Sequence, residues 1–259
     1  MKRVVRRLIA RVAPPVSSGG TRALLYHAVD APDAADCLSL RVSRDAFRAQ
    51  MTLLRDEGLS VVPLPALLDP PANGGRPRVA ITFDDGYRSQ AWAADVLREF
   101  DFPATFFVVP RFLDGVRSPR AYWEQWEHMG WDEAATLMAD GFEIGAHSAT
   151  HPDLRQCGRE QLDEEVAGAK ALLEWRLGRE IVSFSYPYGR HDRRVRTAVK
   201  RAAFRLACTS RYGHTKASGS PYAIPRTEVA GTDRLVDFRW KLLGKYDWLA
   251  YWHDLKPIR

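Results

Sequence analysis

The chain has 259 residues, 46% of them hydrophobic and 27% charged, with a formal net charge of +6 at pH 7. This length and apolar fraction can bury one large core, so the sequence predicts a single barrel-sized domain. No apolar run reaches the roughly 18 residues that a membrane-spanning helix needs, and no basic stripe interleaved with aromatic residues marks a nucleic-acid partner. The positive charge fits a solvated surface, or contact with an anionic glycan, a lipid-linked sugar or an acidic membrane.

Residues 1–20 form a basic N-terminal segment. A predicted helix there carries apolar residues on one face and most of its arginines on another, namely Val5, Leu8, Ile9 and Val12, and Arg3, Arg7 and Arg11. Such a helix could bind an anionic membrane surface, and an ordinary charged terminus is the alternative. The segment lacks the uninterrupted apolar stretch of a secretory signal, which predicts a cytoplasmic protein, at most bound at the inner face of the membrane. Residues 14–20 are rich in Pro, Ser and Gly, so we expect a linker that keeps this segment out of the fold.

Strand and helix patterns then alternate through residues 21–230. Apolar runs typical of strands begin near Leu24, Ser60, Val79, Ala104, Phe142, Ile181 and Arg205. Helical spacing of apolar residues separates several of these runs, with expected N-caps at Ser43 and Ser89 and expected stops at Gly58, Gly141 and Gly178. Alternating β and α units imply a mostly parallel sheet. Seven such strands predict an α/β fold built as a distorted, incomplete (β/α) barrel.

The final segment, residues 231–259, breaks this pattern because aromatic residues crowd into it. They include Phe238, Trp240, Tyr246, Trp248 and Trp252. We expect these rings to pack on the outside or the bottom of the barrel. A lid that stacks on sugars, a membrane contact and a dimer surface are the alternatives.

Two of the predicted strands end in residues that suit a catalytic metal. Asp84 and Asp85 follow one apolar run, and His147 and His151 follow another, four residues apart, so that two imidazoles can share one ion. The carboxyl ends of parallel strands form one face, where α/β enzymes build their active sites. Two histidines and one carboxylate would leave coordination positions open for water and substrate. Surface histidines and a polar turn are the plain alternatives.

These motifs resemble, in order, those of the polysaccharide deacetylases, the NodB-homology group of carbohydrate esterases. The resemblance covers roughly residues 20–230 and rests on Thr82-Phe83-Asp84-Asp85-Gly86, His147-Ser148-x-x-His151 and Tyr186-Pro187-Tyr188-Gly189. It implies a divalent-metal site at Asp85, His147 and His151, with zinc expected first and iron, cobalt or manganese as alternatives. It also implies that Asp84 is the general base and that the backbone N–H of Tyr188 helps to hold the oxyanion.

The chain departs from the family pattern at two places. Many members carry an arginine that contacts the base where this chain has Ser185, and Arg226 is the candidate replacement, with a plain surface arginine as the alternative. The late Leu-x-x-His motif that usually supplies the catalytic acid has no match after residue 190. Leu24-Leu25-Tyr26-His27 matches it at the start of the domain, as in deacetylases of poly-N-acetylglucosamine. We therefore expect His27 to be the acid. The alternative is a histidine at the end of a strand that only hydrogen-bonds a loop carbonyl.

The resemblance implies a metal-dependent hydrolase that removes N-acetyl groups from amino sugars in a glycan or a glycan precursor. The expected partner is thus an N-acetylated saccharide, with no nucleic acid. One alternative is a deformylase or deacetylase of a lipid-linked or nucleotide-linked amino sugar. A non-catalytic glycan-binding relative is another, although the intact Asp84, Asp85, His147 and His151 oppose it. The sequence predicts no particular oligomeric state.

Overall fold

Eight strands form one parallel sheet in the computed structural model, which describes residues 3–14, 21–31, 36, 38–70, 76–116, 126–215 and 219–250. The strands are β1 (Arg22–Tyr26), β4 (Ser60–Val61), β5 (Arg78–Phe83), β6 (Ala104–Val108), β7 (Glu143–Ala146), β8 (Ser183–Ser185), β9 (Leu206–Cys208) and β10 (Arg226–Glu228). Their order is β10-β1-β5-β6-β7-β8-β9, and β4 pairs with the start of β5. A separate pair joins β2 (Ala28–Val29) to β3 (Arg41–Val42).

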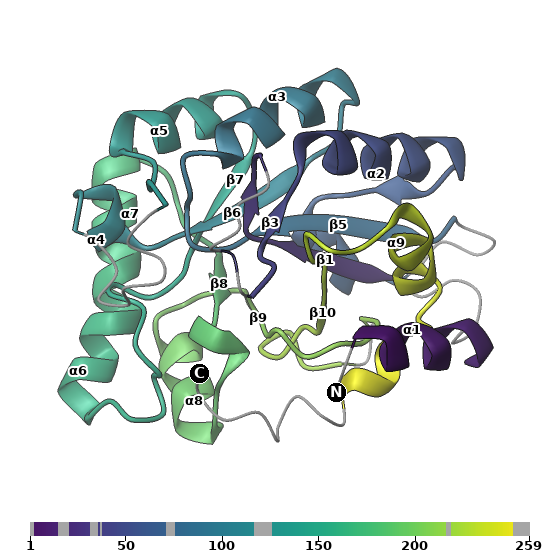
Figure 1. Cartoon of the computed structure of the whole chain (residues 1–259). Coiled ribbons are helices and arrows are strands. Elements are labelled where there is room, and N and C mark those ends of the chain that lie inside the picture. Colours follow the sequence, from purple (N-terminus) through teal and green to yellow (C-terminus); the bar gives the residue numbers. More distant parts are fainter. Residues whose placement is uncertain are drawn as a thin grey trace.

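The sheet curls until its two ends almost meet (Figure 1). At one end β10 pairs with β1, and just before β10 the residue Ile224 forms a parallel bridge to Cys208 of β9. The expected distorted (β/α) barrel is confirmed. All seven expected strands are present, but β10 was not among them, because its residues Arg226-Thr227-Glu228 are polar and carry no apolar signal. Arg226 and Thr227 are buried, and Glu228 partly buried, where the barrel closes around them.

Helices cover the outside of the sheet (Figure 1). They are α2 (Arg44–Asp56), α3 (Gln90–Glu99), α4 (Pro110–Leu113), α5 (Trp131–Ala139), α6 (Arg159–Asp163), a π-helical stretch (Glu164–Gly168), α7 (Ala169–Leu177) and α8 (Arg193–Arg201), with 3₁₀ turns at Leu64–Leu68, Pro187–Gly189 and Asp247–Leu249. Ser43 accepts a hydrogen bond from the Ala46 N–H and so caps α2 as expected, whereas Ser89 precedes α3 without a side-chain cap. Gly178 ends α7 in the left-handed conformation that glycine favours.

Both faces of the sheet are buried, which is why its strands read as continuous apolar runs. Alternate residues of β5 face opposite ways: Ile81 and Phe83 belong to the core under the helices, and Ala80 belongs to the cluster that fills the barrel. Phe83 stacks on Phe106 of β6, with ring centroids 4.7 Å apart. Inside the barrel, Leu64 and Leu67 of the first 3₁₀ turn pack with Ala80. The apolar filling leaves the polar residues at the carboxyl ends of the strands to form the site.

The N-terminal helix α1 (Arg3–Val12) packs on the C-terminal part of the chain rather than standing apart from it. Arg7 forms an ion pair with Asp237 of α9 (Leu235–Leu242) at 3.0 Å, and Ala10 is buried against Tyr246 and Leu249. The expectation that a linker keeps the basic N-terminal segment out of the fold is therefore wrong for the described helix Arg3–Val12, and most of the linker, residues 14–20, lies outside the described residues.

The C-terminal segment is joined to the barrel through a buried arginine. Arg22, at the start of β1, donates to both carboxylate oxygens of Asp247, at 2.9 and 3.0 Å, and to the Leu242 carbonyl oxygen. Phe238 of α9 belongs to the main hydrophobic core. Residues 251–259, which include Trp252 of the aromatic segment, lie outside the described part of the chain. None of the described helices has the length and apolar character needed to cross a bilayer.

Candidate active site

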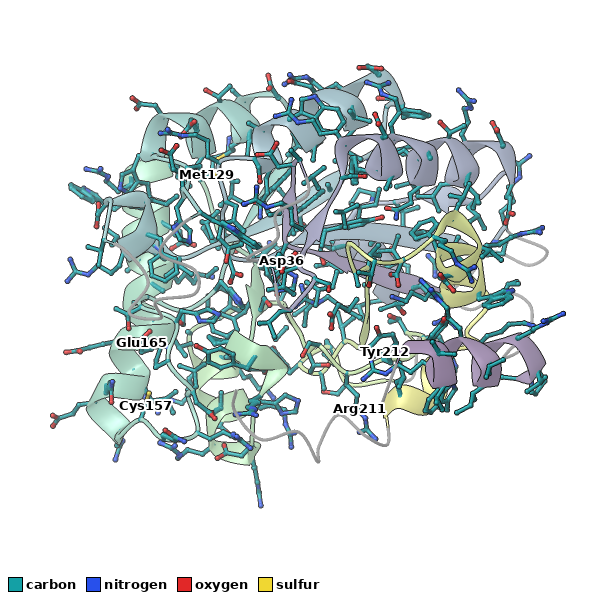
Figure 2. The ribbon with its side chains drawn as sticks, in the orientation of Figure 1. Asp36, Met129, Cys157, Glu165, Arg211 and Tyr212 are labelled. Atoms are coloured by element: carbon teal, nitrogen blue, oxygen red, sulfur yellow. The ribbon has the colours of Figure 1, made fainter. Side chains whose placement is uncertain are left out.

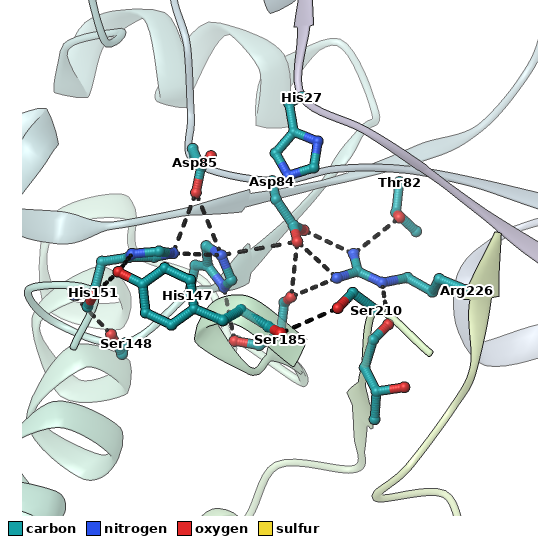
Figure 3. A network of polar contacts seen from close by, with 12 residues as sticks. His27, Thr82, Asp84, Asp85, His147, Ser148, His151, Ser185, Ser210 and Arg226 are labelled. Atoms are coloured by element: carbon teal, nitrogen blue, oxygen red, sulfur yellow. Dashed lines mark hydrogen bonds and ion pairs between the residues drawn. The ribbon is translucent and has the colours of Figure 1, made fainter. Parts of the chain in front are cut away.

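Asp85, His147 and His151 bring three potential metal ligands together at the carboxyl ends of β5 and β7 (Figure 3). One Asp85 oxygen lies 3.4 Å from the Nε2 atom of each imidazole, and the two Nε2 atoms lie 3.2 Å apart. All three residues are buried, at 2–6% exposure. The three atoms thus form a nearly equilateral triangle inside the protein.

Hydrogen bonds fix which nitrogen of each histidine carries the proton. His147 Nδ1 lies 2.7 Å from the Ser185 carbonyl oxygen, which can only accept, so Nδ1 is the donor. The Tyr188 hydroxyl donates to the His151 carbonyl oxygen and lies 2.9 Å from His151 Nδ1. Since a hydroxyl has a single proton, it accepts the hydrogen bond from that nitrogen. Both Nε2 atoms are then left with lone pairs that face each other and Asp85.

This arrangement fits a metal ion. Two lone pairs and a carboxylate oxygen repel one another at such short distances, and a cation among them removes the repulsion. A tetrahedral ion with bonds of about 2.0–2.1 Å would hold its ligand atoms about 3.3–3.4 Å apart, close to the sides of the triangle. Imidazoles with their Nδ1–H groups bound to a carbonyl and a hydroxyl are also the usual outer support of histidine ligands.

Asp84, the neighbour of Asp85, is held in a different environment by Arg226 of β10. Arg226 donates to both Asp84 oxygens, at 2.7 and 2.6 Å. Its remaining N–H groups donate to Thr82 Oγ1, Ser185 Oγ and the Thr209 carbonyl oxygen, so all five are used (Figure 3). Ser185 also donates to Asp84 at 3.2 Å. The small serine leaves room for a guanidinium that arrives from another strand.

The positive charges around the two carboxylates outweigh the cost of burying them. Burial would raise the pKa of Asp84, but the charge and hydrogen bonds of Arg226, with His147, hold that pKa below its usual value. Burial also acts to raise the pKa of Asp85, and the His147 and His151 rings lower it when they carry a second proton, on the nitrogen that faces Asp85. Both carboxylates are therefore ionised at neutral pH.

His27 follows β1 and points toward Asp84 (Figure 3). Its charged form would lower the pKa of both Asp84 and Asp85, so its ring stands close to the two carboxylates. Its Nδ1 atom is buried and has no hydrogen-bond partner among the described residues. The Gln90 side-chain amide donates to the backbone carbonyls of His27 and Asp84, at 2.9 and 2.7 Å, and so ties the ends of β1 and β5 together.

Four non-glycine residues of the site adopt the left-handed backbone conformation that side chains disfavour. They are Asp85, Ser148, His151 and Tyr188, with φ of 73°, 61°, 63° and 59°. Each such residue costs about 1–3 kcal/mol and persists only where surrounding contacts enforce it. Here the Ser148 hydroxyl accepts from the His151 N–H, and the Tyr188 carbonyl accepts from Ser210. Strain of this kind concentrates where function needs a particular side-chain direction.

Several supporting residues escaped the sequence analysis. Glu165, in the π-helical stretch, accepts from the N–H and hydroxyl of Thr150 and so holds the loop between the two histidines. Tyr87 is buried beside Asp85, and its hydroxyl has no hydrogen-bond partner among the described residues. His128 stacks on the Tyr87 ring at 4.9 Å, and burial lowers its pKa. Glu165 lies in a π-helical stretch, and Tyr87 and His128 are isolated residues, so no sequence motif identifies these three positions.

A family model for polysaccharide deacetylases matches residues 72–207, which include Asp84, Asp85, His147, His151 and Tyr188. The chain belongs to the polysaccharide deacetylase family. It is therefore a hydrolase of carbon–nitrogen bonds other than peptide bonds.

The relatives found by sequence are distant. YxkH of Bacillus subtilis, assigned by name to the same family, is 25% identical over 211 residues, which cover 80% of this chain and 70% of YxkH. The chitooligosaccharide deacetylase of Sinorhizobium fredii is 34% identical over 106 residues, or 40% of this chain and 43% of that enzyme. The match thus spans less than half of that curated enzyme.

Solved structures share the fold over most of the chain. IcaB from Ammonifex degensii superposes with a TM-score of 0.73 at 26% identity, covering 87% of this chain and 98% of IcaB. The Streptococcus pyogenes deacetylase PplD superposes with a TM-score of 0.74 at 20% identity, covering 87% of this chain and 99% of PplD. At 20% identity, the similarity to PplD supports the fold alone.

Tyr188→Phe should weaken metal binding by about 10–100-fold, because it removes the hydroxyl that fixes the His151 ring and its tautomer. Titration of the metal-free protein with zinc, followed by calorimetry, measures this. Tyr186→Phe is the matched control, since the Tyr186 hydroxyl donates to the Tyr222 carbonyl oxygen instead. Equal affinities in Tyr188→Phe and the unsubstituted protein would contradict the assigned hydrogen-bond direction.

Proposed function

We propose that this protein is a metal-dependent N-deacetylase of amino sugars in a glycan or a glycan precursor. The observation that supports it most directly is the triangle of Asp85, His147 and His151 beside an ionised Asp84. A site that holds a cation with three protein ligands and keeps a second carboxylate nearby suits hydrolysis of an amide. The chitooligosaccharide deacetylases among the relatives carry that activity in their names.

Two histidines and one carboxylate, spaced for tetrahedral coordination, favour zinc, with iron, cobalt or manganese as alternatives. A divalent ion held by Asp85, His147 and His151 would supply a Lewis acid, which lowers the pKa of water and polarises the acetamide carbonyl. Asp84 would then accept the proton of the attacking water. Because Arg226 keeps Asp84 ionised, this base is available without a preceding proton loss.

The remaining roles belong to Tyr188 and His27. The backbone N–H of Tyr188 would donate to the oxygen that gains negative charge as water adds to the carbonyl carbon. His27 would protonate the amide nitrogen as the carbon–nitrogen bond breaks, because an amine leaves poorly as an anion. The products are acetate and a free amino sugar.

Asp85→Asn should lose the metal and with it acetate release, whereas Asp84→Asn should keep the metal and lose acetate release. The difference follows because only Asp85 faces both imidazole nitrogens. Metal analysis of the purified proteins, combined with acetate release from N-acetylglucosamine oligomers, measures both. A metal-free Asp84→Asn would mean that the two aspartates have exchanged roles. Metal-loaded protein without acetate release from any N-acetylated sugar would refute the proposed function.

Arg226→Met should move the acidic limb of the pH profile of kcat/KM upward by about one to three pH units. Arg226 lowers the pKa of Asp84, so without its charge the base becomes protonated at a higher pH and activity is lost sooner on acidification. Arg226→Lys, which keeps a charge, should shift the limb less. Thermal unfolding monitors the separate effect on stability. If the acidic limb of the pH profile does not move in Arg226→Met, Arg226 has only a structural role.

His27→Ala should lower kcat by about 10²–10⁴-fold while metal content stays unchanged, because the leaving amine lacks a proton donor. The loss should be smaller for an acetate ester, whose leaving group needs less protonation. His214→Ala is the control, since His214 lies beside Asp247 near the opposite end of the barrel. An equal loss for amide and ester substrates would exclude His27 as the acid.

A further inference from the structure

The helix α1 is amphipathic, and it packs against the protein through its polar side. Arg7 and Ala10, three residues apart, lie on one stripe of the helix. Arg7 pairs with Asp237 and donates to the Thr232 carbonyl oxygen, and Ala10 is fully buried against Tyr246 and Leu249. Tyr212, labelled beside α1 in Figure 2, packs against the same cluster. An ion pair and a small residue therefore hold α1 in place.

The apolar side of α1 faces outward. Val4, Leu8 and Val12, four residues apart, form the opposite stripe and are 66, 57 and 81% exposed. Val5, beside this stripe, is 42% exposed. A helix on the surface of a globular protein normally turns its apolar stripe to the core and its charges to water. Here the arrangement is reversed, so the fold provides no cover for this stripe among the described residues.

The neighbouring end of α9 extends the apolar surface. Leu235 and Val236, the first two residues of α9, are 44% and 40% exposed and directly precede Asp237, the partner of Arg7. These exposed apolar residues lie on two helices that contact each other through Arg7 and Asp237. We refer to them together as the α1–α9 surface. Exposed apolar residues gathered on adjoining elements mark a binding surface far more often than scattered ones do.

Exposed arginines lie at the α1–α9 surface. Arg11 is exposed on α1 and borders the apolar stripe, and Arg234, also exposed, directly precedes Leu235. The carboxylate that contacts α1 belongs to Asp237, which is 1% exposed and already paired with Arg7 and Arg234. The surface therefore combines exposed apolar side chains with arginines at its border, and the charge of the buried Asp237 beneath it is neutralised by its partners. That pairing matches the interface of a bilayer that contains anionic lipids.

We propose that the α1–α9 surface binds an anionic lipid bilayer, with α1 lying in the plane of the interface. Val4, Leu8 and Val12 would enter the boundary between headgroups and acyl chains, and Arg11 would contact lipid phosphates. A ten-residue helix is too short to cross a bilayer but suits this orientation. The ion pair between Arg7 and the buried Asp237 fixes the position of α1 on the barrel, so binding would also orient the barrel relative to the membrane. The proposal is independent of the proposed function.

Sedimentation of the full chain with lipid vesicles tests this. The protein should sediment with vesicles of phosphatidylcholine mixed with phosphatidylglycerol, and much less with phosphatidylcholine alone. Leu8→Asp/Val12→Asp should weaken binding to the anionic vesicles by about tenfold or more, because two apolar side chains leave the interface. Arg11→Glu should weaken it less, and added salt should weaken binding of the unsubstituted protein. Binding is read without substrate, so its failure would not bear on catalysis.

Val116→Asp/Trp175→Asp is the matched control. Val116 and Trp175 are 51% and 75% exposed, which is similar to the exposure of Leu8 and Val12. Val116 follows α4 and Trp175 belongs to α7, and both helices lie on the other side of the barrel from α1 (Figure 1). This variant should bind vesicles like the unsubstituted protein. Failure of the unsubstituted protein to bind anionic vesicles, or equal weakening in both double variants, would overturn the proposal. So would a dimer in solution that Leu8→Asp/Val12→Asp converts to monomers, since a second copy would then cover the surface.

Discussion

The buried ion pair between Arg226 and Asp84 is the interaction on which the rest of the site depends. Both side chains are almost inaccessible to solvent, at 0% and 4% exposure, and a buried charge without a partner would cost several kcal/mol. The hydrogen bonds offset this cost, because every N–H of the guanidinium has an acceptor, including Thr82 and Ser185. Those acceptors come from different strands, so the barrel must close for the pair to form. Closure by β10 thus completes the environment of Asp84.

The pair also separates the roles of two carboxylates that are adjacent in sequence. Like charges at such proximity normally push one pKa upward. Arg226 stabilises the charge of Asp84, and a cation held between Asp85 and the two imidazoles would stabilise the charge of Asp85. A base whose pKa is this low is weak, so it can take a proton only from water that is already acidified. A metal ion held at Asp85 would supply that acidity, so the proposed reaction would need both carboxylates.

The sequence predicted those parts of the molecule that carry a local pattern. Apolar runs marked the strands through Cys208, and the motifs placed Asp84, Asp85, His147 and His151 at strand ends that the structure brings together. It did not predict β10, because three polar residues become a strand only when the barrel closes. The supporting contacts of Glu165 and Tyr87 escaped for the same reason: each depends on a neighbour brought close by the fold. Long-range partners set these positions, and no spacing in the sequence encodes them.

Helix α1 also shows where prediction from the sequence is limited. Its periodicity correctly separates an apolar stripe from an arginine stripe, yet periodicity alone does not say which stripe meets the protein. The general expectation is the apolar one, because burying it is favourable. Here a buried carboxylate, Asp237, attracts Arg7, and the small Ala10 allows close approach. These two contacts set the orientation of the helix, so that its apolar stripe stays exposed among the described residues.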